Sequence, residues 1–97
     1  MLSDLCSRGW NCIRFFPDFS DDETFQPREH IASIGHASKE HSALIGHLHW
    51  VAAEIARSKG LTKGYRTVIN TGEDGGQTVD HLHLHLLGGR IMNWPPG

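Results

Sequence analysis

Histidine and leucine alternate strictly along the segment His81–Leu87. A period of two places every second side chain on the same face of a β-strand. The imidazoles of His81, His83 and His85 therefore share one face, at intervals of roughly 6.5–7 Å along the strand. The leucines between them share the other face. The pattern predicts a half-buried strand that presents three histidines from its polar face.

A helical period governs a longer stretch that precedes this strand. Ser38 is a suitable N-cap, and Gly60 is a suitable residue to end a helix. The pattern predicts one amphipathic helix over residues 38–59, with three histidines mostly outside its apolar stripe. The stripe consists of Leu44, Ile45, Leu48, Val51, Ala52, Ile55 and Ala56.

These elements predict a small domain of the α+β class. We expect Tyr65–Asn70 and His81–Leu87 to pair as antiparallel strands, with the long helix packed on one face of the sheet. The chain has 97 residues and is 38% hydrophobic, which is enough for a modest core. We divide it into an N-terminal segment, residues 1–26, and the core of the same domain, residues 27–97.

A glycine-rich loop, residues 70–79, leads into the histidine strand. Its three glycines permit tight turns and converging backbone N–H groups, which can bind an anion. Gln77 and Thr78 add neutral donors directly before the histidines. An ordinary hairpin loop would account for the glycines but not for these donors. Together they suit a phosphoryl group, whose oxygens the donors hold while a neutral imidazole attacks phosphorus.

Two other interpretations of the histidine face stay open at this point. The histidines can be ordinary structural residues, although three on one strand face disfavour this. They can also bind zinc, since a site of three histidines with an open position is a working catalytic arrangement. Asp80 would point to the face opposite His81, and no cysteine lies nearby. These two facts disfavour a metal site.

The segment from Asn70 to Gly97 resembles the histidine-triad (HIT) family of nucleotide-binding proteins. The family pattern is His-φ-His-φ-His-φ-φ, where φ is apolar, and this chain has the whole triad after a Gly-Gly-Gln-Thr-Val lead-in. The Gly-Gly-Arg that follows and the ending Asn-Trp-Pro-Pro-Gly resemble the purine nucleoside phosphoramidase branch. The nucleotidyltransferase branch carries Gln where this chain has His85. The resemblance extends over roughly residues 27–97.

The resemblance implies a catalytic role for each triad histidine. His83 matches the nucleophile that attacks the α-phosphorus and forms a covalent nucleotidyl-histidine. His85 matches the histidine that contacts a phosphate oxygen, and His81 matches the one that orients the nucleophile. His30, in the segment Pro27-Arg28-Glu29-His30, matches a fourth histidine that is hydrogen-bonded to the triad.

The resemblance also implies residues that bind the nucleotide. One of them, Trp94, matches a residue that approaches the substrate across a dimer interface. In the family, the long helix and a sheet edge pair about a two-fold axis, so we expect a homodimer. The remaining positions that match ligand contacts are Asn70, Gly76, Gln77 and Thr78.

The N-terminal segment diverges from the family pattern. Cys12–Ser20 faintly resembles a family stretch in which Asp18 would grip the ribose hydroxyls, and Phe15 or Phe16 would line the base pocket. The strand expected next reads Glu23–Gln26, which is too polar for a central buried strand. We expect a solvated edge strand, or else a sheet rebuilt in this region.

Composition excludes other classes of partner. The formal net charge of −2 gives no basic field for nucleic acid. No apolar run is long enough to span a membrane. Met1–Cys12 does not read as a secretory signal, and Cys6 and Cys12 lack a C-x-x-C spacing. We expect two free thiols, no structural zinc on them, and a cytoplasmic protein.

The resemblance therefore implies a homodimeric hydrolase that cleaves the P–N bond of purine nucleoside 5′-phosphoramidates. It would need no metal or organic cofactor, because His83 supplies the nucleophile. The alternatives are a nucleotide-binding or protein-interaction module with weak or lost catalysis, owing to the divergent N-terminal segment, and a metal-dependent hydrolase.

Overall fold

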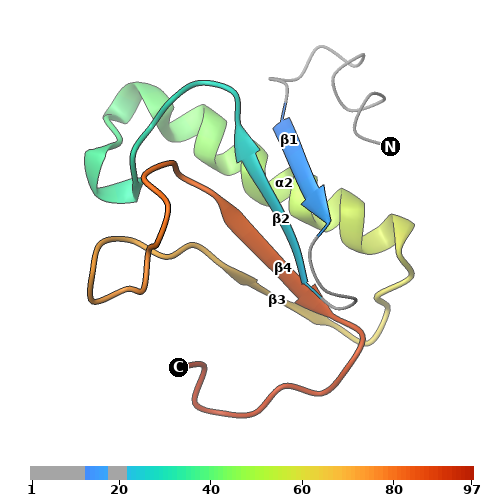
Figure 1. Ribbon diagram of the computed structural model, residues 1–97. Coiled ribbons are helices and arrows are strands. Elements are labelled where there is room, and N and C mark those ends of the chain that lie inside the picture. The colour runs from blue at the N-terminus through green and yellow to red at the C-terminus, as the bar shows by residue number, and fades with distance from the viewer. Residues whose placement is uncertain (1–12, 18–21) are drawn as a thin grey trace.

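A computed structural model describes residues 13–17 and 22–97, with side chains from Thr24 onward. It contains a four-stranded sheet with one long helix across one face (Figure 1). The strands are β1 (Ile13–Pro17), β2 (Asp22–Pro27), β3 (Tyr65–Val68) and β4 (Leu84–Gly88), and the helices are η1 (Ile34–His36), η2 (Lys39–His41) and α2 (Ser42–Ser58).

The sheet has the strand order β1-β2-β4-β3, and every neighbouring pair is antiparallel. Strand β4 therefore has a partner on each side. His85 lies opposite Thr24 of β2 and also opposite Val68 of β3. Because directly opposed residues in antiparallel strands share a face, these three side chains belong to one surface of the sheet.

The core lies between the sheet and α2. Leu82 and Leu84 are 0% exposed and Leu86 is 2% exposed, so these leucines face the helix. Burying a leucine side chain stabilises the fold by about 1.5–3 kcal/mol. The predicted apolar stripe of the helix is confirmed, since all but Ile45 of its members are buried in this core. The other core residues are Phe25 and Ile31.

The helix begins later than the sequence predicts. Residues 39–41 form a separate 3₁₀ turn, η2, and the α-helix begins at Ser42. The Ser38 N–H donates to Nδ1 of His41 at 3.0 Å, which closes this turn. Ser38 therefore caps the 3₁₀ turn rather than the α-helix.

The helix ends as the sequence predicts. Gly60 has a φ of +72°, a conformation that glycine adopts without steric cost. Its N–H donates to the Arg57 carbonyl at 3.1 Å, and the Leu61 N–H donates to the Ala56 carbonyl at 3.0 Å. This pair of bonds is a Schellman motif, which satisfies the last carbonyls of the helix.

The expectation of a solvated edge strand at Glu23–Gln26 is wrong. Strand β2 is an interior strand, paired with β1 on one side and β4 on the other. Phe25 is 0% exposed and Pro27 is also buried, while Thr24 and Gln26 are half-buried. Phe25 and Pro27 on the helix-facing side, with Thr24 and Gln26 on the other side, are enough for this interior position.

The two predicted C-terminal strands are shorter than expected. Strand β3 ends at Val68 instead of Asn70, and β4 begins at Leu84 instead of His81. Before β4, the Leu82 N–H donates to the Ile31 carbonyl at 2.6 Å, outside the sheet ladder. The leucine–histidine alternation still continues through this segment, since Leu82 is buried and His81 and His83 are half-buried. No described helix is long and apolar enough to cross a membrane.

Candidate active site

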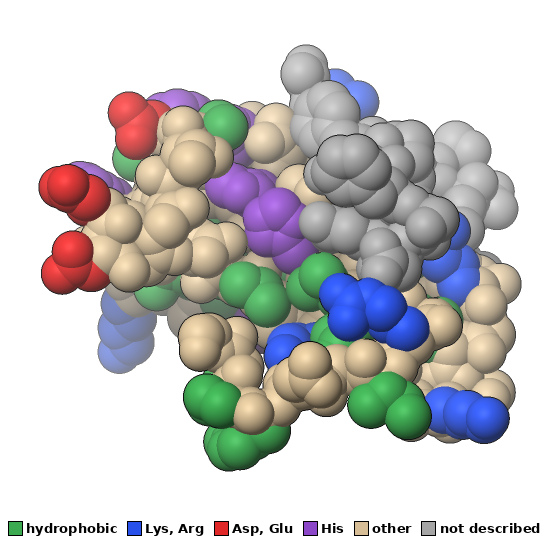
Figure 2. All heavy atoms as spheres, turned by 60° about the horizontal axis from the view of Figure 1, so that its bottom comes forward, with side chains coloured by type: hydrophobic (Ala, Val, Ile, Leu, Met, Phe, Trp, Pro, Cys, Tyr) green, Lys and Arg blue, Asp and Glu red, His purple; other side chains and the backbone are tan. Residues whose placement is uncertain are grey.

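The three triad histidines gather on the sheet face opposite α2. Each is half-buried, whereas the leucines between them are buried against the helix. Histidine side chains lie together on the face shown in Figure 2. The sequence prediction of one histidine-bearing face is therefore confirmed.

His83 has a defined tautomer. Its Nδ1 atom lies 2.7 Å from the carbonyl oxygen of His81. A carbonyl oxygen only accepts hydrogen bonds, so Nδ1 must carry the proton. In the neutral ring, Nε2 then holds the lone pair. This is the state that a histidine nucleophile requires.

His81 is fixed by the end of strand β2. Its Nε2 lies 2.9 Å from the Pro27 carbonyl oxygen, so Nε2–H donates to it. This bond fixes the His81 ring. The carbonyl oxygen of His81 in turn accepts the hydrogen bond from His83 Nδ1. Pro27 therefore contributes to the site through its backbone, a contribution that the sequence analysis did not identify.

His85 is joined to strand β2 by a side-chain contact. Its Nδ1 lies 3.1 Å from Oγ1 of Thr24, the residue opposite it in the sheet register. The rings of His83 and His85 lie nearly perpendicular, with centroids 5.0 Å apart and an interplanar angle of 75°. The sequence analysis missed Thr24, whose contact with His85 depends on a register that local sequence does not encode.

His30 lies beside the triad, as the resemblance implies. Its ring meets that of His81 edge to face, with centroids 5.0 Å apart and an interplanar angle of 82°. The resemblance implies a hydrogen bond between His30 and the triad. In the described structure the two rings meet through an aromatic contact instead. His30 is also exposed to solvent, unlike the triad histidines.

The glycine-rich loop is closed by its own amide side chains. Gln77 Nε2 donates to the carbonyls of Ala32, at 2.6 Å, and Val79, at 2.9 Å, and its Oε1 accepts from the Gly72 N–H at 2.9 Å. Asn70 Nδ2 donates to a further loop carbonyl at 2.6 Å. In this structure both amides therefore shape the loop, and their contact with a phosphate stays a prediction.

Gly75 is required by the close approach of the loop to itself. A Cβ atom at this position would overlap the backbone of Thr71. Gly72 and Gly76 have φ values of +71° and +76°, which favour glycine. The loop thus depends on each glycine for a steric or conformational reason.

Two other predicted binding residues, Thr78 and Trp94, take no part in the triad contacts described above. Thr78 is exposed, and Trp94 is 83% exposed in the segment after β4. The neighbouring Asn93 carbonyl accepts from Arg66 Nη2 at 3.0 Å, which ties this segment to β3. Asp18 lies outside the described residues, and for Phe15 and Phe16 only the backbone of β1 is described.

No metal centre is apparent in the described part of the chain. There, no three His, Cys, Asp or Glu side chains converge closely enough to hold an ion. The triad histidines instead have one ring nitrogen each in contact with Pro27, the His81 carbonyl or Thr24. Burial lowers the pKa of one further histidine, His47 on α2.

Two relatives share much of this sequence. A HIT-like protein of Synechococcus elongatus, named as uncharacterized, is 61% identical over 71 residues, which are 73% of this chain and 62% of that protein. A 14 kDa zinc-binding protein of Zea mays is 47% identical over 70 residues, which are 72% of this chain and 55% of that protein. The matched segment therefore spans less than two-thirds of either relative.

Solved structures share the fold. A HIT family hydrolase from Legionella pneumophila has a TM-score of 0.82 at 41% identity, over 88% of this chain and 80% of that one. A histidine triad protein from Clostridium difficile has a TM-score of 0.72 at 25% identity, over 92% and 90%. The HIT domain itself matches residues 25–92, which is more than half of the sequence. The chain therefore belongs to the HIT domain family.

Proposed function

We propose that this chain is a nucleotide-binding hydrolase that cleaves the P–N bond of purine nucleoside 5′-phosphoramidates. The observation that carries the proposal is the bond from His83 Nδ1–H to the His81 carbonyl, which presents Nε2 as a nucleophile. The intact triad and the similarity to a named HIT family hydrolase support the same reaction class.

In the first step, the Nε2 lone pair of His83 attacks phosphorus and the P–N bond of the substrate breaks. The electron pair of that bond stays on the leaving nitrogen, which takes up a proton from solvent and departs as the amine. The nucleotidyl-histidine ring then carries phosphorus on Nε2 and a proton on Nδ1, so it is positively charged. The His81 carbonyl, 2.7 Å from Nδ1, stabilises this charge by accepting its hydrogen bond.

In the second step, water attacks phosphorus and the bond between phosphorus and His83 breaks. The electron pair returns to Nε2, the water loses a proton to solvent, and the nucleoside monophosphate is released. Splitting one displacement into two steps is the general advantage of covalent catalysis.

The remaining residues have supporting roles in the proposal. His85 contacts a phosphoryl oxygen, and Thr24 positions its ring from 3.1 Å away. His81 positions the nucleophile, and His30 packs on His81. The proposed nucleotide contacts are Asn70, Gly76, Gln77, Thr78, Asp18 and Trp94.

The proposal includes a homodimer. Strand β3 is the outer strand on its side of the described sheet, and outer strands have an open ladder to which a second copy can pair. Trp94 of one copy, exposed here, would then approach the substrate of the other copy.

Zinc is not part of the proposal, although the maize relative is named as a zinc-binding protein. The described residues offer no cluster of three ligands that would fit such an ion. We therefore assign no step to a metal.

A non-catalytic nucleotide-binding module is the second candidate. One observation favours it: both N–H groups of the Gln77 amide donate to backbone carbonyls rather than facing an open site. If Gln77 cannot turn toward a phosphate, binding without turnover would result.

Intact-mass spectrometry after rapid, acid-free quenching with adenosine 5′-phosphoramidate distinguishes the two candidates. The wild-type chain should gain the mass of one nucleotidyl group, and His83→Ala should not. His49→Ala, which removes an exposed histidine of α2, is the matched control and should behave as wild type. Nucleotide binding with neither adduct nor turnover would favour the non-catalytic module.

A further inference from the structure

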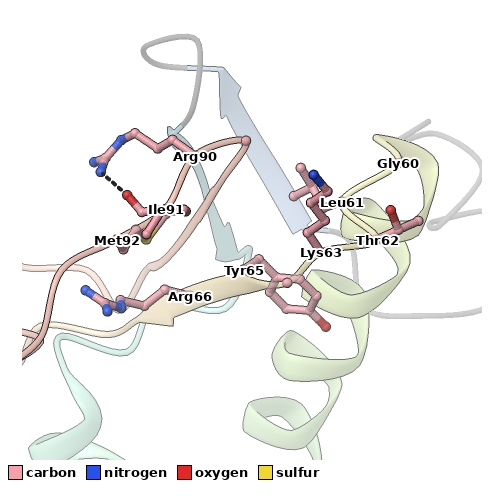
Figure 3. Close-up of a pocket in the computed structure, with 11 residues that line it drawn as sticks. Gly60, Leu61, Thr62, Lys63, Tyr65, Arg66, Arg90, Ile91 and Met92 are labelled. Carbon is pink, nitrogen blue, oxygen red and sulfur yellow. Dashed lines mark hydrogen bonds between the residues drawn. The ribbon is translucent and has the colours of Figure 1, made fainter.

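A cavity of about 700 Å³ lies at the open edge of the sheet. It is enclosed by the loop that follows α2, the start of β3 and the segment after β4 (Figure 3). In the proposed homodimer a second copy pairs along β3, so this edge is the surface that the partner would cover. The cavity also lies at the Gly88 end of β4, whereas His83 precedes the other end of that strand. Donors to the reacting phosphoryl group must therefore lie on another part of the sheet.

Gln26, on the interior strand β2, lies beside the proposed nucleophile. The sheet register pairs Phe25 with Leu84, and one further step along these antiparallel strands leads to Gln26 and His83. Because Phe25 and Leu84 are buried against α2, the next residue on each strand faces the other side of the sheet, and both are half-buried. Directly opposed residues have Cβ atoms about 4.5–5.5 Å apart, a separation that a long side chain spans.

Two contacts on either side of Gln26 support this alignment of the strands. On one side, Thr24 Oγ1 lies 3.1 Å from His85 Nδ1. On the other side, the Pro27 carbonyl accepts the hydrogen bond from His81 Nε2 at 2.9 Å. Gln26 therefore lies between the two residues of β2 that contact the outer triad histidines, at the level of the central one.

The amide of Gln26 is available to a ligand. No described residue forms a hydrogen bond with it, and its polar atoms are not buried. The Gln77 amide differs in this respect, because both of its N–H groups donate to backbone carbonyls. Of these two amides, the one beside His83 is the one whose donors are not already used within the described chain.

The reaction at His83 requires such a donor. As Nε2 attacks, negative charge develops on the two non-bridging oxygens of the phosphoryl group. Fixed N–H donors that point at developing charge stabilise a transition state more than they stabilise the bound substrate. The proposed function assigns one of these oxygens to His85, which leaves the other for a second donor.

We propose that Gln26 is a catalytic residue that donates a hydrogen bond to one non-bridging oxygen of the phosphoryl group, while His85 contacts the other. This inference rests on the proposed hydrolysis at His83. It places a direct contact to the reacting group on β2, the strand that also positions His85 through Thr24.

Two substitutions of Gln26 test the proposal with adenosine 5′-phosphoramidate. Gln26→Leu removes the amide but keeps much of the bulk, and we expect kcat to fall about 10- to 100-fold, as for a lost hydrogen bond to a charged group, with little change in KM. Gln26→Glu keeps the shape but presents an anionic oxygen, so its kcat should fall further. Thr67→Val is the matched control, because Thr67 lies opposite buried Leu86 on the other face of the sheet. It should leave kcat unchanged.

Sulfur substitution separates a direct contact from an effect on the fold. In the two diastereomers of adenosine 5′-phosphoramidothioate, sulfur replaces one or the other non-bridging oxygen, and sulfur is a weak acceptor of hydrogen bonds. Gln26→Leu should slow the diastereomer whose sulfur faces residue 26 about tenfold less than it slows the other. A purely structural role of Gln26 would slow both diastereomers equally.

Equal kcat values for wild type and both Gln26 variants would overturn the role of Gln26, as would equal slowing of the two diastereomers. Hydrolysis by wild type in those cases would still uphold the proposed function. A wild-type chain that hydrolyses none of these substrates would overturn the proposed function itself, and this inference with it.

Discussion

The carbonyl oxygen of His81 accepts a hydrogen bond from Nδ1 of His83, at 2.7 Å and only two residues away. The backbone of one triad residue thus selects the tautomer of another. This arrangement needs no carboxylate to orient the His83 ring. It also makes the orientation of the His83 ring dependent on the position of His81, whose ring donates to the Pro27 carbonyl.

Replacing the proposed nucleophile, His83, should abolish turnover without unfolding the chain. We expect His83→Ala to lower kcat/KM for adenosine 5′-phosphoramidate by on the order of 10³-fold or more, as removal of other catalytic nucleophiles does. His83 is half-buried on the face opposite the core, so circular dichroism should be unchanged. Steady-state kinetics within a few-fold of wild type would contradict its assignment as nucleophile.

Thr24 should act through His85. Thr24→Val keeps the shape of the side chain but removes the oxygen that contacts His85 Nδ1. We expect kcat to fall about tenfold, the cost of one lost polar contact of about 1–1.5 kcal/mol, with little change in KM. Thr24→Ser retains the hydroxyl and should restore most of kcat. Equal kcat values for the Val and Ser variants would show that the hydroxyl has no such role.

Gly75 should be essential to the loop that precedes the triad. Gly75→Ala places a Cβ against the Thr71 backbone, and we expect it to lower the free energy of unfolding by about 1–3 kcal/mol. Gly46→Ala is the control, because nothing lies within 4 Å of a Cβ at that helical position. It should raise stability by up to about 1 kcal/mol. Urea denaturation of both variants measures the difference.

His47 should make the fold sensitive to acid. Burial lowers the pKa of His47 from its ordinary value of 6.5, so the unfolded chain binds a proton more readily than the folded one. The stability that neutral His47 contributes is fully present above pH 6.5 and is lost as the pH falls through its folded-state pKa.

Denaturation curves at pH 8 and pH 5 measure this effect. His47→Gln removes the titrating group, so the variant should lose less stability than wild type between these pH values. His49→Gln, at an exposed position of the same helix, should lose as much as wild type. If all three proteins lose the same free energy of unfolding between pH 8 and pH 5, His47 is not the source of the acid sensitivity.

Local sequence patterns were sufficient to predict the apolar stripe of α2, the end of this helix at Gly60 and the shared face of the triad histidines. These features depend on spacing within a short segment. Local patterns failed at β2, where Phe25 is buried only because β2 pairs with β4, a strand distant in sequence. The contact of Thr24 with His85 depends on the same register and was missed for the same reason.

The glycine loop illustrates a different limit. The sequence predicts that Gln77 donates hydrogen bonds to a phosphoryl group. Gln77 does donate two hydrogen bonds, but its partners in the structure are the Ala32 and Val79 carbonyls. A residue type specifies what bonds a side chain can make. Which groups it meets depends on how residues 31–33 lie against the loop.

The pairing of β2 with β4 has a consequence for how the protein acquires activity. The segment that supplies Thr24, the Pro27 carbonyl and His30 is separated from the triad by the whole of α2. The helix can form from local contacts, but this strand pairing must close a long loop, which is slow. During refolding, catalytic activity should therefore return after the helical signal, so that enzyme assays report the last long-range step of folding rather than the first collapse.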